Sequence, residues 1–113
     1  MDKVKTYISY IETILQKYAT LQPVGDWNEY ENQVIIDKNN KHFQLIRVGW
    51  KGSERTYHIV MHLDIKDDKI WIQEDWTEEG IANELTQMGV PKDCIVLGFY
   101  APFRRGDTEF ATA

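Results

Sequence analysis

The stretch that decides the fold is KHFQLIRVGWKGSERTYHIVMHLDIKDDKIWIQED, residues 41–75. Its runs of Val, Ile, Phe, Tyr and Trp are typical of strands, and KGSE at 51–54 and KDDK at 66–69 interrupt them. A third interruption, KNNK, stands at 38–41. Asn and Asp tolerate left-handed backbone angles, so short hairpin turns suit these places. We therefore expect a meander of four antiparallel strands, near residues 32–38, 41–51, 55–66 and 69–75.

The register of this meander follows from its turns, because paired residues share one face of a sheet. Pairing Trp50 with Arg55 across one turn, and then Lys66 with Lys69 across the next, predicts a core face. That face collects Ile46, Val48, Trp50, Tyr57, Ile59, Met61, Leu63, Ile65, Ile70 and Ile72. The opposite face collects Val34, Ile36, Phe43, Leu45, Arg47, His58, Val60, His62, Asp64, Trp71 and Gln73. This second face is too apolar for full solvation, so we expect protein to cover part of it.

Helices flank the meander. Apolar residues recur at helical spacing over residues 3–21, and Asp2 can cap that helix. Thr77 is the expected cap of a second helix, which ends at Gly89. An extended apolar segment follows at 94–99. The sequence thus predicts an α+β fold, with an N-terminal helix, a four-stranded antiparallel meander, a second helix and a C-terminal extended segment or fifth strand, in a single domain over residues 1–113.

Composition limits the partners and the compartment. The chain has 113 residues, a net charge of -5 and one cysteine. No apolar run approaches the ~18 residues of a membrane span, and the N-terminus lacks the apolar region of a signal peptide. With no pair of cysteines for a disulfide, we expect a cytoplasmic protein without membrane contact. The acidic balance predicts that any DNA contact is indirect or weak, since nonspecific phosphate binding uses clustered Lys and Arg.

Two histidines resemble a metal pair at first sight. His58 and His62 are four residues apart, which on a strand is about 13 Å at ~3.3 Å per residue. Ligand bonds to zinc are only about 2 Å long, so these two residues cannot share one ion. We expect surface histidines here, His58 beside Arg47 and His62 beside Phe43, and no metal or other cofactor.

Other candidate catalytic groups have structural explanations. Acidic residues gather around one hairpin, at Asp64, Asp67, Asp68, Glu74 and Asp75. The two central aspartates suit the turn, and Trp76 stands where a nuclease element commonly has lysine. Cys94 begins an apolar run and is expected to be a buried structural thiol rather than a nucleophile. We expect no catalytic residues.

The C-terminal segment DCIVLGFYAPFRRGDTEFATA, residues 93–113, is unusually aromatic for a tail. We expect residues 99–110 to be ordered against protein, either in the same chain or in a second copy. Trp71 points away from the predicted core face and is of the type that anchors interfaces. We therefore expect a homo-oligomer, with an interface drawn from Phe43, Leu45, Val60, Trp71, Phe99, Tyr100, Phe103, Arg104 and Arg105.

Three segments carry a resemblance to a known family. They are KIWIQEDWTEEGIANEL at 69–85, MGVPKDCIVLGFYAP at 88–102 and TEFATA at 108–113. They strongly resemble the XisI family, the fdxN element excision controlling factors. The resemblance begins near RVGW at 47–50 and passes through RTYHIVMHLDI at 55–65, so it covers most of the chain.

The resemblance implies an accessory protein of programmed DNA-element excision, a site-specific recombination. XisI-like proteins act beside a recombinase and with a partner, XisH, that resembles nucleases. The resemblance implies no catalytic residues. We expect a non-enzymatic factor that controls an XisH-like partner through protein–protein contacts, because an acidic protein suits a basic or nuclease-like partner better than naked DNA.

Two alternatives stay open. An enzyme would use the acidic hairpin from Asp64 to Asp75 to hold a divalent metal for phosphodiester cleavage. A direct DNA-binding protein would use Lys92, Arg104 and Arg105, and its affinity would fall steeply as salt rises.

Overall fold

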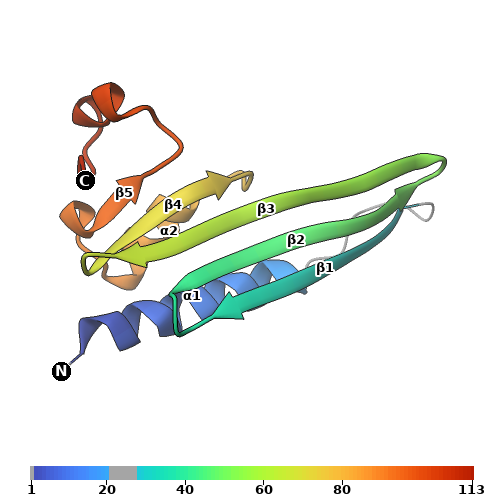
Figure 1. Cartoon of the computed structure of the whole chain (residues 1–113), viewed down its shortest axis with the longest axis horizontal. Coiled ribbons are helices and arrows are strands. Elements are labelled where there is room, and N and C mark those ends of the chain that lie inside the picture. Colours follow the sequence, from blue (N-terminus) through green and yellow to red (C-terminus); the bar gives the residue numbers. More distant parts are fainter. Residues whose placement is uncertain (1, 21–27) are drawn as a thin grey trace.

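The computed structural model describes residues 2–20 and 28–113, and its element order agrees with the expected one (Figure 1). The elements are α1 (Lys3–Ala19), β1 (Asn28–Asp37), β2 (His42–Lys51), β3 (Glu54–Lys66), β4 (Lys69–Asp75), α2 (Ile81–Met88), the 3-10 helix η1 (Lys92–Cys94), β5 (Ile95–Leu97) and the 3-10 helix η2 (Pro102–Asp107). The last residue of the first predicted helix, at 21, lies outside the described residues.

The strands form one five-stranded sheet in the order β1-β2-β3-β4-β5. The first four pair as an antiparallel meander, and β5 returns to pair parallel with β4. The predicted α+β fold is confirmed, and the C-terminal segment is a fifth strand. Both helices share one hydrophobic core with β2 to β5, so the sheet has a helix-covered inner face and an opposite outer face.

Turn chemistry at the β3–β4 hairpin is as the sequence predicts, whereas at the β1–β2 hairpin the left-handed residue is Lys41, at φ 61°, and not one of the asparagines. Asp67 and Asp68 have φ of 53° and 61°, and they link the paired residues Lys66 and Lys69. This left-handed conformation is one that Asp adopts more readily than most residues. The turn therefore accounts for two of the acidic residues around this hairpin.

A bulge in β3 overturns the predicted faces. From the turn inward the register is as expected, up to Ile46 opposite Ile59. The next pair is Leu45 with Met61, so Val60 is an extra residue in β3. Such an insertion moves every later side chain to the other face relative to its partner strand. A second irregularity lies between β3 and β4, where Gln73 is the extra residue.

The consequence is a different core from the predicted one. Phe43 and Leu45 have no exposed surface and pack in the core, and Val60 is 6% exposed there. The prediction that these residues belong to the second face was wrong, and their burial in the core leaves them unavailable as the interface residues that were expected. Ile46, Val48, Trp50, Tyr57 and Ile59 were wrongly assigned to the core face, since the pairing places them on the outer face. Met61, Leu63, Ile65, Ile70 and Ile72 do lie in the core as expected.

The second helix is capped from the end of a strand and not by Thr77. The carboxylate of Asp75 accepts a hydrogen bond from the Ile81 N–H at 2.7 Å, and it also accepts one from the hydroxyl of Thr77 at 2.6 Å. Thr77 makes no side-chain bond to the helix backbone because Gly80, at φ 87°, is the residue before the helix. The predicted end at Gly89 is confirmed, with φ 111°. Asp75 is therefore a structural residue.

The two helices are tied by a buried carboxylate. Glu84 of α2 accepts hydrogen bonds from Lys17 Nζ and from Tyr18 Oη of α1, both at 2.7 Å. Burial, together with the hydrogen bond to Glu84, raises the pKa of the Tyr18 phenol well above its ordinary range. The hydroxyl of Tyr18 therefore stays a donor at all physiological pH values.

The tail after β5 lies against its own chain. The Ala111 N–H donates to the Ile95 carbonyl at 2.9 Å, and Tyr100 and Phe110 pack against the core. Val96 of β5 is fully buried outside that core, on the outer face that the tail covers. The tail thus covers the outer face only at its β4–β5 end, and Phe103 remains 85% exposed.

Candidate functional site

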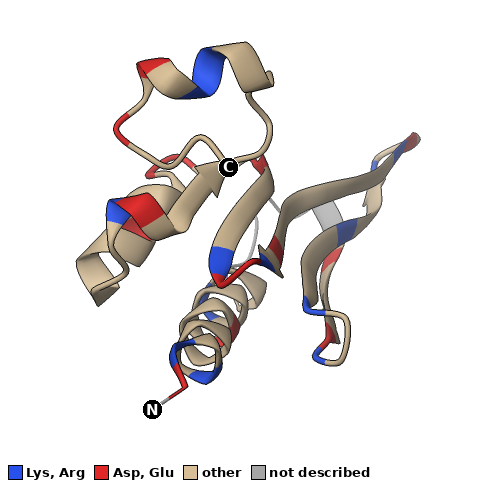
Figure 2. Ribbon diagram, turned by 60° about the vertical axis from the view of Figure 1, so that its left-hand side comes forward, with Lys and Arg blue, Asp and Glu red and all other residues tan. Residues whose placement is uncertain are grey.

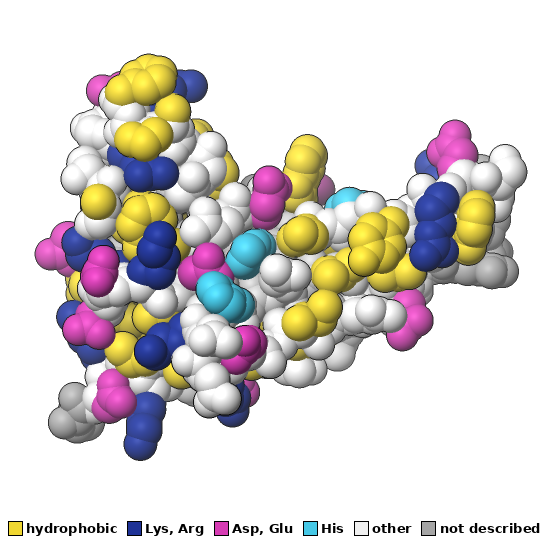
Figure 3. Space-filling model, in the orientation of Figure 1, with side chains coloured by type: hydrophobic (Ala, Val, Ile, Leu, Met, Phe, Trp, Pro, Cys, Tyr) yellow, Lys and Arg dark blue, Asp and Glu magenta, His cyan; other side chains and the backbone are white. Residues whose placement is uncertain are grey.

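The outer face of β1, β2 and β3 carries an apolar patch on the arm of the molecule, the part of the hairpins that extends beyond the helices. We call it the arm patch. It consists of Val48, Trp50, Tyr57 and Ile59, and it continues toward the helices through Ile46, which is only 9% exposed, and Ile35. Ile35, Trp50 and Tyr57 are 45%, 46% and 66% exposed. Figure 3 shows apolar side chains running along this extended part. Contiguous exposed apolar surface of this kind marks interaction sites.

Arg55 supplies a cation within the arm patch. Its guanidinium carbon lies 5.3 Å from the ring centroid of Trp50 and 5.9 Å from that of Tyr57. Aromatic residues and arginine are the residue types enriched at interface hot spots. The arm patch therefore combines the side chains typical of a protein contact.

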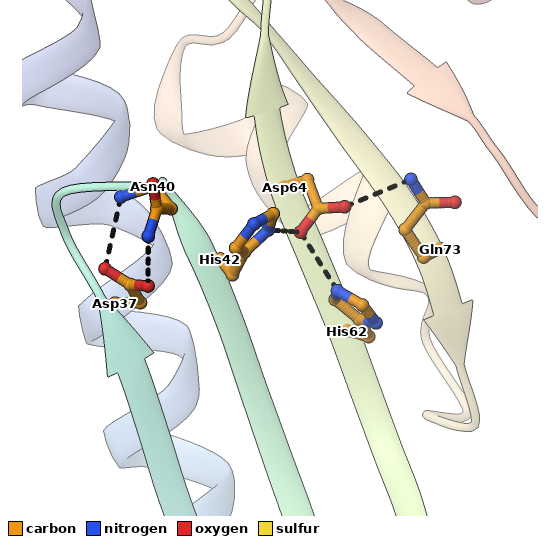
Figure 4. Close-up of polar contacts among 6 residues, drawn as sticks. All are labelled: Asp37, Asn40, His42, His62, Asp64 and Gln73. Atoms are coloured by element: carbon orange, nitrogen blue, oxygen red, sulfur yellow. Dashed lines mark hydrogen bonds and ion pairs between the residues drawn. The ribbon is translucent and has the colours of Figure 1, made fainter.

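Closer to the body, the same face becomes polar. Asp64 Oδ1 lies 2.7 Å from His42 Nδ1 and 2.9 Å from His62 Nε2. Its second oxygen, Oδ2, accepts a hydrogen bond from Gln73 Nε2 at 3.2 Å. We call these four residues, drawn in Figure 4, the His–Asp cluster. Three adjacent strands, β2, β3 and β4, contribute to it.

The His–Asp cluster holds its carboxylate charged. Asp64 is only 8% exposed, and burial alone would raise its pKa. Hydrogen bonds from His42, His62 and Gln73 outweigh burial, so the pKa of Asp64 lies below its ordinary value. An ionised, nearly buried carboxylate thus sits between two imidazoles.

Sequence reasoning missed this cluster. In a register without a bulge, His42 falls opposite Leu63 and His62 lies beside Phe43, whereas the bulge at Val60 brings His42 opposite Asp64 and His62 opposite Gln44. The predicted pairing of His58 with Arg47 is confirmed. One signal was present, because Ile59, Val60 and Met61 are consecutive apolar residues that break the strand alternation.

The remaining acidic residues of the hairpin do not converge with Asp64. Asp67 and Asp68 form the turn, Asp75 caps α2, and Glu74 accepts a hydrogen bond from the exposed Trp76 indole at 2.8 Å. Each of these residues therefore has a structural role that does not involve the metal-dependent cleavage considered above.

The tail places its predicted interface residues around Trp71. Arg105 lies over the Trp71 ring at 5.2 Å and donates to the Tyr100 carbonyl at 3.1 Å, while Lys66 lies 4.4 Å from the same ring. Arg104 lies over Tyr100 at 5.5 Å. Phe99, 46% exposed, and Phe103 face outward beside them. The structure therefore brings Trp71, Tyr100, Arg104 and Arg105 together and leaves the two phenylalanines accessible.

Cys94 is partly buried and packs against the core, in keeping with the expected structural thiol. Burial is the larger cause, and a hydrogen bond with the Cys94 thiol the smaller one, that together raise the pKa of the Tyr7 phenol to about 12. Within residues 2–20 and 28–113, no helix is both long and apolar enough to cross a membrane.

The fold and these sites define a small α+β protein that presents an apolar sheet face beside a polar cluster. Its family follows from comparison. The family model described as XisI protein matches residues 1–112, and the chain belongs to the XisI family. No curated protein matches the chain.

Two crystal structures from Anabaena variabilis are similar over nearly the full length. One is of a XisI-like protein, with 42% identity, a TM-score of 0.86, and coverage of 96% of this chain and 97% of that chain. The other is of the fdxN element excision controlling factor XisI, with 38% identity, a TM-score of 0.84, and coverage of 99% of this chain and 100% of that chain. The resemblance inferred from the sequence is confirmed.

Proposed function

We propose that this protein is a cytoplasmic accessory factor that controls excision of a DNA element by binding an XisH-like partner, without catalysing a reaction itself. Family membership and the relative described as an excision controlling factor support the role in excision. The observation that carries the mode of action is the arm patch, an apolar and aromatic sheet face on which Trp50 and Tyr57 are 46% and 66% exposed.

The energetics favour a partner on this patch. Trp50 and Tyr57 expose much of their rings, and burying them would gain free energy at roughly 25 cal/mol per Å² of apolar area. Glu31, which is exposed and lies opposite Val48, supplies a charge of the kind found at the polar rim of an interface. Burial of this sheet face against a protein is therefore lower in free energy than its exposure to water.

Direct DNA binding is less well supported. Of the three cations that would contact phosphate, Arg105 donates to the Gly98 and Tyr100 carbonyls, and Lys92 pairs with Glu109 at 2.8 Å. Lys and Arg are spread over the elements in Figure 2, often with acidic residues beside them. We propose that contact with DNA is indirect, through the partner.

Self-association is a second part of the proposal. Phe103 and Phe99 stand exposed beside Trp71, Tyr100, Arg104 and Arg105, and a second copy of the chain could cover them in a symmetric contact. The tail is anchored within its own chain, by a backbone hydrogen bond to β5 and by Arg105 over the Trp71 ring, so its order does not depend on a second copy. The exposed phenylalanines alone support the homo-oligomer.

Co-expression with the XisH-like partner tests the proposed function. We expect the partner to co-purify with the wild-type chain and to be lost when Trp50→Ser is combined with Tyr57→Ser. Trp76→Ser is the matched control, because Trp76 is 71% exposed but lies outside the arm patch. Equal retention of the partner by the double variant and the control would refute the role of the arm patch.

A further inference from the structure

The His–Asp cluster presents three ligand atoms of kinds that metals prefer. One ligand atom each from His42, His62 and Asp64 lies within 4.8 Å of the other two. In the part of the chain that the structure describes, this is the one group of three or more such residues that meets this condition. Two imidazole nitrogens with one carboxylate oxygen form a donor set that suits zinc and similar divalent transition metals.

The distances are close to those of a loaded site. Ligand bonds of about 2.0–2.2 Å in a tetrahedral zinc site separate neighbouring ligand atoms by roughly 3.3–3.5 Å. The two oxygen–nitrogen distances here are 2.7 and 2.9 Å. The carboxylate and the imidazoles therefore need to separate by about half an ångström to admit an ion, which rotation of the side chains supplies.

The surroundings orient the ligands. Gln73 holds Asp64 Oδ2 and leaves Oδ1 facing both imidazoles, which is the usual task of a residue that supports a metal ligand. Asp64 is nearly buried, while the side chain of His62 is 23% exposed and that of His42 is 53% exposed. An ion could enter past His42, and water could occupy a fourth position on that side.

We propose that His42, His62 and Asp64 form a binding site for a divalent transition-metal ion of the zinc type. Three protein ligands leave one coordination position for water or for a group from a partner. The site lies on the outer face next to the arm patch, since His42 and Ile46 both lie on that side of β2. The proposal concerns binding and does not depend on the proposed function.

Titration of the untagged chain of residues 1–113, after dialysis against a chelator, tests this site. Zinc binding is measured by calorimetry, and cobalt binding is measured by visible absorption. We expect one saturable ion per chain and a cobalt spectrum of nitrogen and oxygen coordination. His42→Ala and His62→Ala should each weaken zinc binding at least tenfold. Gln73→Ala should weaken it by about tenfold, since supporting residues typically account for 10–100-fold in affinity.

His58→Ala is the matched control, because His58 is exposed and lies on β3, the strand of His62, but outside the His–Asp cluster. We expect its zinc affinity to equal that of the wild type. His42 is exposed enough to be replaced without opening the core, so circular dichroism should show an intact fold for His42→Ala. The proposal is overturned by the lack of saturable binding in the wild type, by unchanged affinity in folded His42→Ala, or by an equal loss in His58→Ala.

Discussion

The arm and the body of the sheet differ on the same outer face. Over the body, β2 to β4 present His42, His62, Asp64 and Gln73, which satisfy one another's hydrogen bonds. Along the arm, β1 to β3 present the arm patch, whose Trp50 and Tyr57 are exposed. The inner face of the body is a conventional core under two helices. Folding explains the body, whereas the exposed apolar side chains of the arm form the surface that the proposed partner would cover.

The bulge at Val60 separates these two regions. On the arm side of it, Ile46 and Ile59 pair on the outer face, and on the body side, Leu45 and Met61 pair on the inner face. One inserted residue therefore lets β3 supply apolar side chains to opposite faces at its two ends. The predictions below test whether these faces are assigned correctly and what each supports.

The largest effect is expected from the inner face. Leu45→Ala should lower the free energy of unfolding by about 2–5 kcal/mol, because it leaves a cavity in the core. Val48→Ala, three residues away on the outer face, should cost less than about 1 kcal/mol. Urea unfolding measures both. A larger loss of stability for Val48→Ala than for Leu45→Ala would contradict this assignment and support a register without a bulge, in which Val48 faces the core.

A smaller effect is expected at the tail. Arg105→Ala removes hydrogen bonds to two carbonyls and the stacking on Trp71, so it should cost about 1.5–3 kcal/mol. Arg104→Ala is the control, since Arg104 is exposed and contacts one ring. Thermal unfolding would show the difference as a lower Tm for Arg105→Ala. Equal values of Tm for the two variants would mean that Arg105 does not anchor the tail.

The smallest effect concerns the charge of Asp64. Its pKa is depressed in the folded state, so the ionised carboxylate stabilises the fold above its ordinary pKa of about 3.9. This contribution is lost as the pH falls through the lower folded value. Metal-free Asp64→Asn should therefore lose less Tm than the wild type between pH 6 and pH 3. Asp68→Asn, at the exposed turn, is the control, and an Asp64→Asn slope identical to the wild type would contradict the account.

The comparison also explains how far the sequence could predict the molecule. Spacing and turn residues located the four strands of the meander, although β1 begins at Asn28 and not near residue 32. Asp67 and Asp68 report their turn through their side-chain chemistry. The apolar run Ile59-Val60-Met61 signals an irregularity, but valine is equally suited to a regular strand and to a bulge, so the run does not identify Val60 as the extra residue. The resulting shift hid the pairing of His42 with Asp64 and exchanged the faces of Leu45 and Ile46. The cap at Asp75 was missed for a similar reason, since it depends on how β4 meets α2 in space.

The central claim is that the arm, and not the body, is the surface that binds the XisH-like partner. Hydrogen–deuterium exchange of the chain with and without that partner measures this most directly, because both regions are followed in one experiment. We predict slower exchange in residues 46–59 of the complex, with α2 unchanged. Slower exchange confined to α2 and the tail, with residues 46–59 unaffected, would contradict the account.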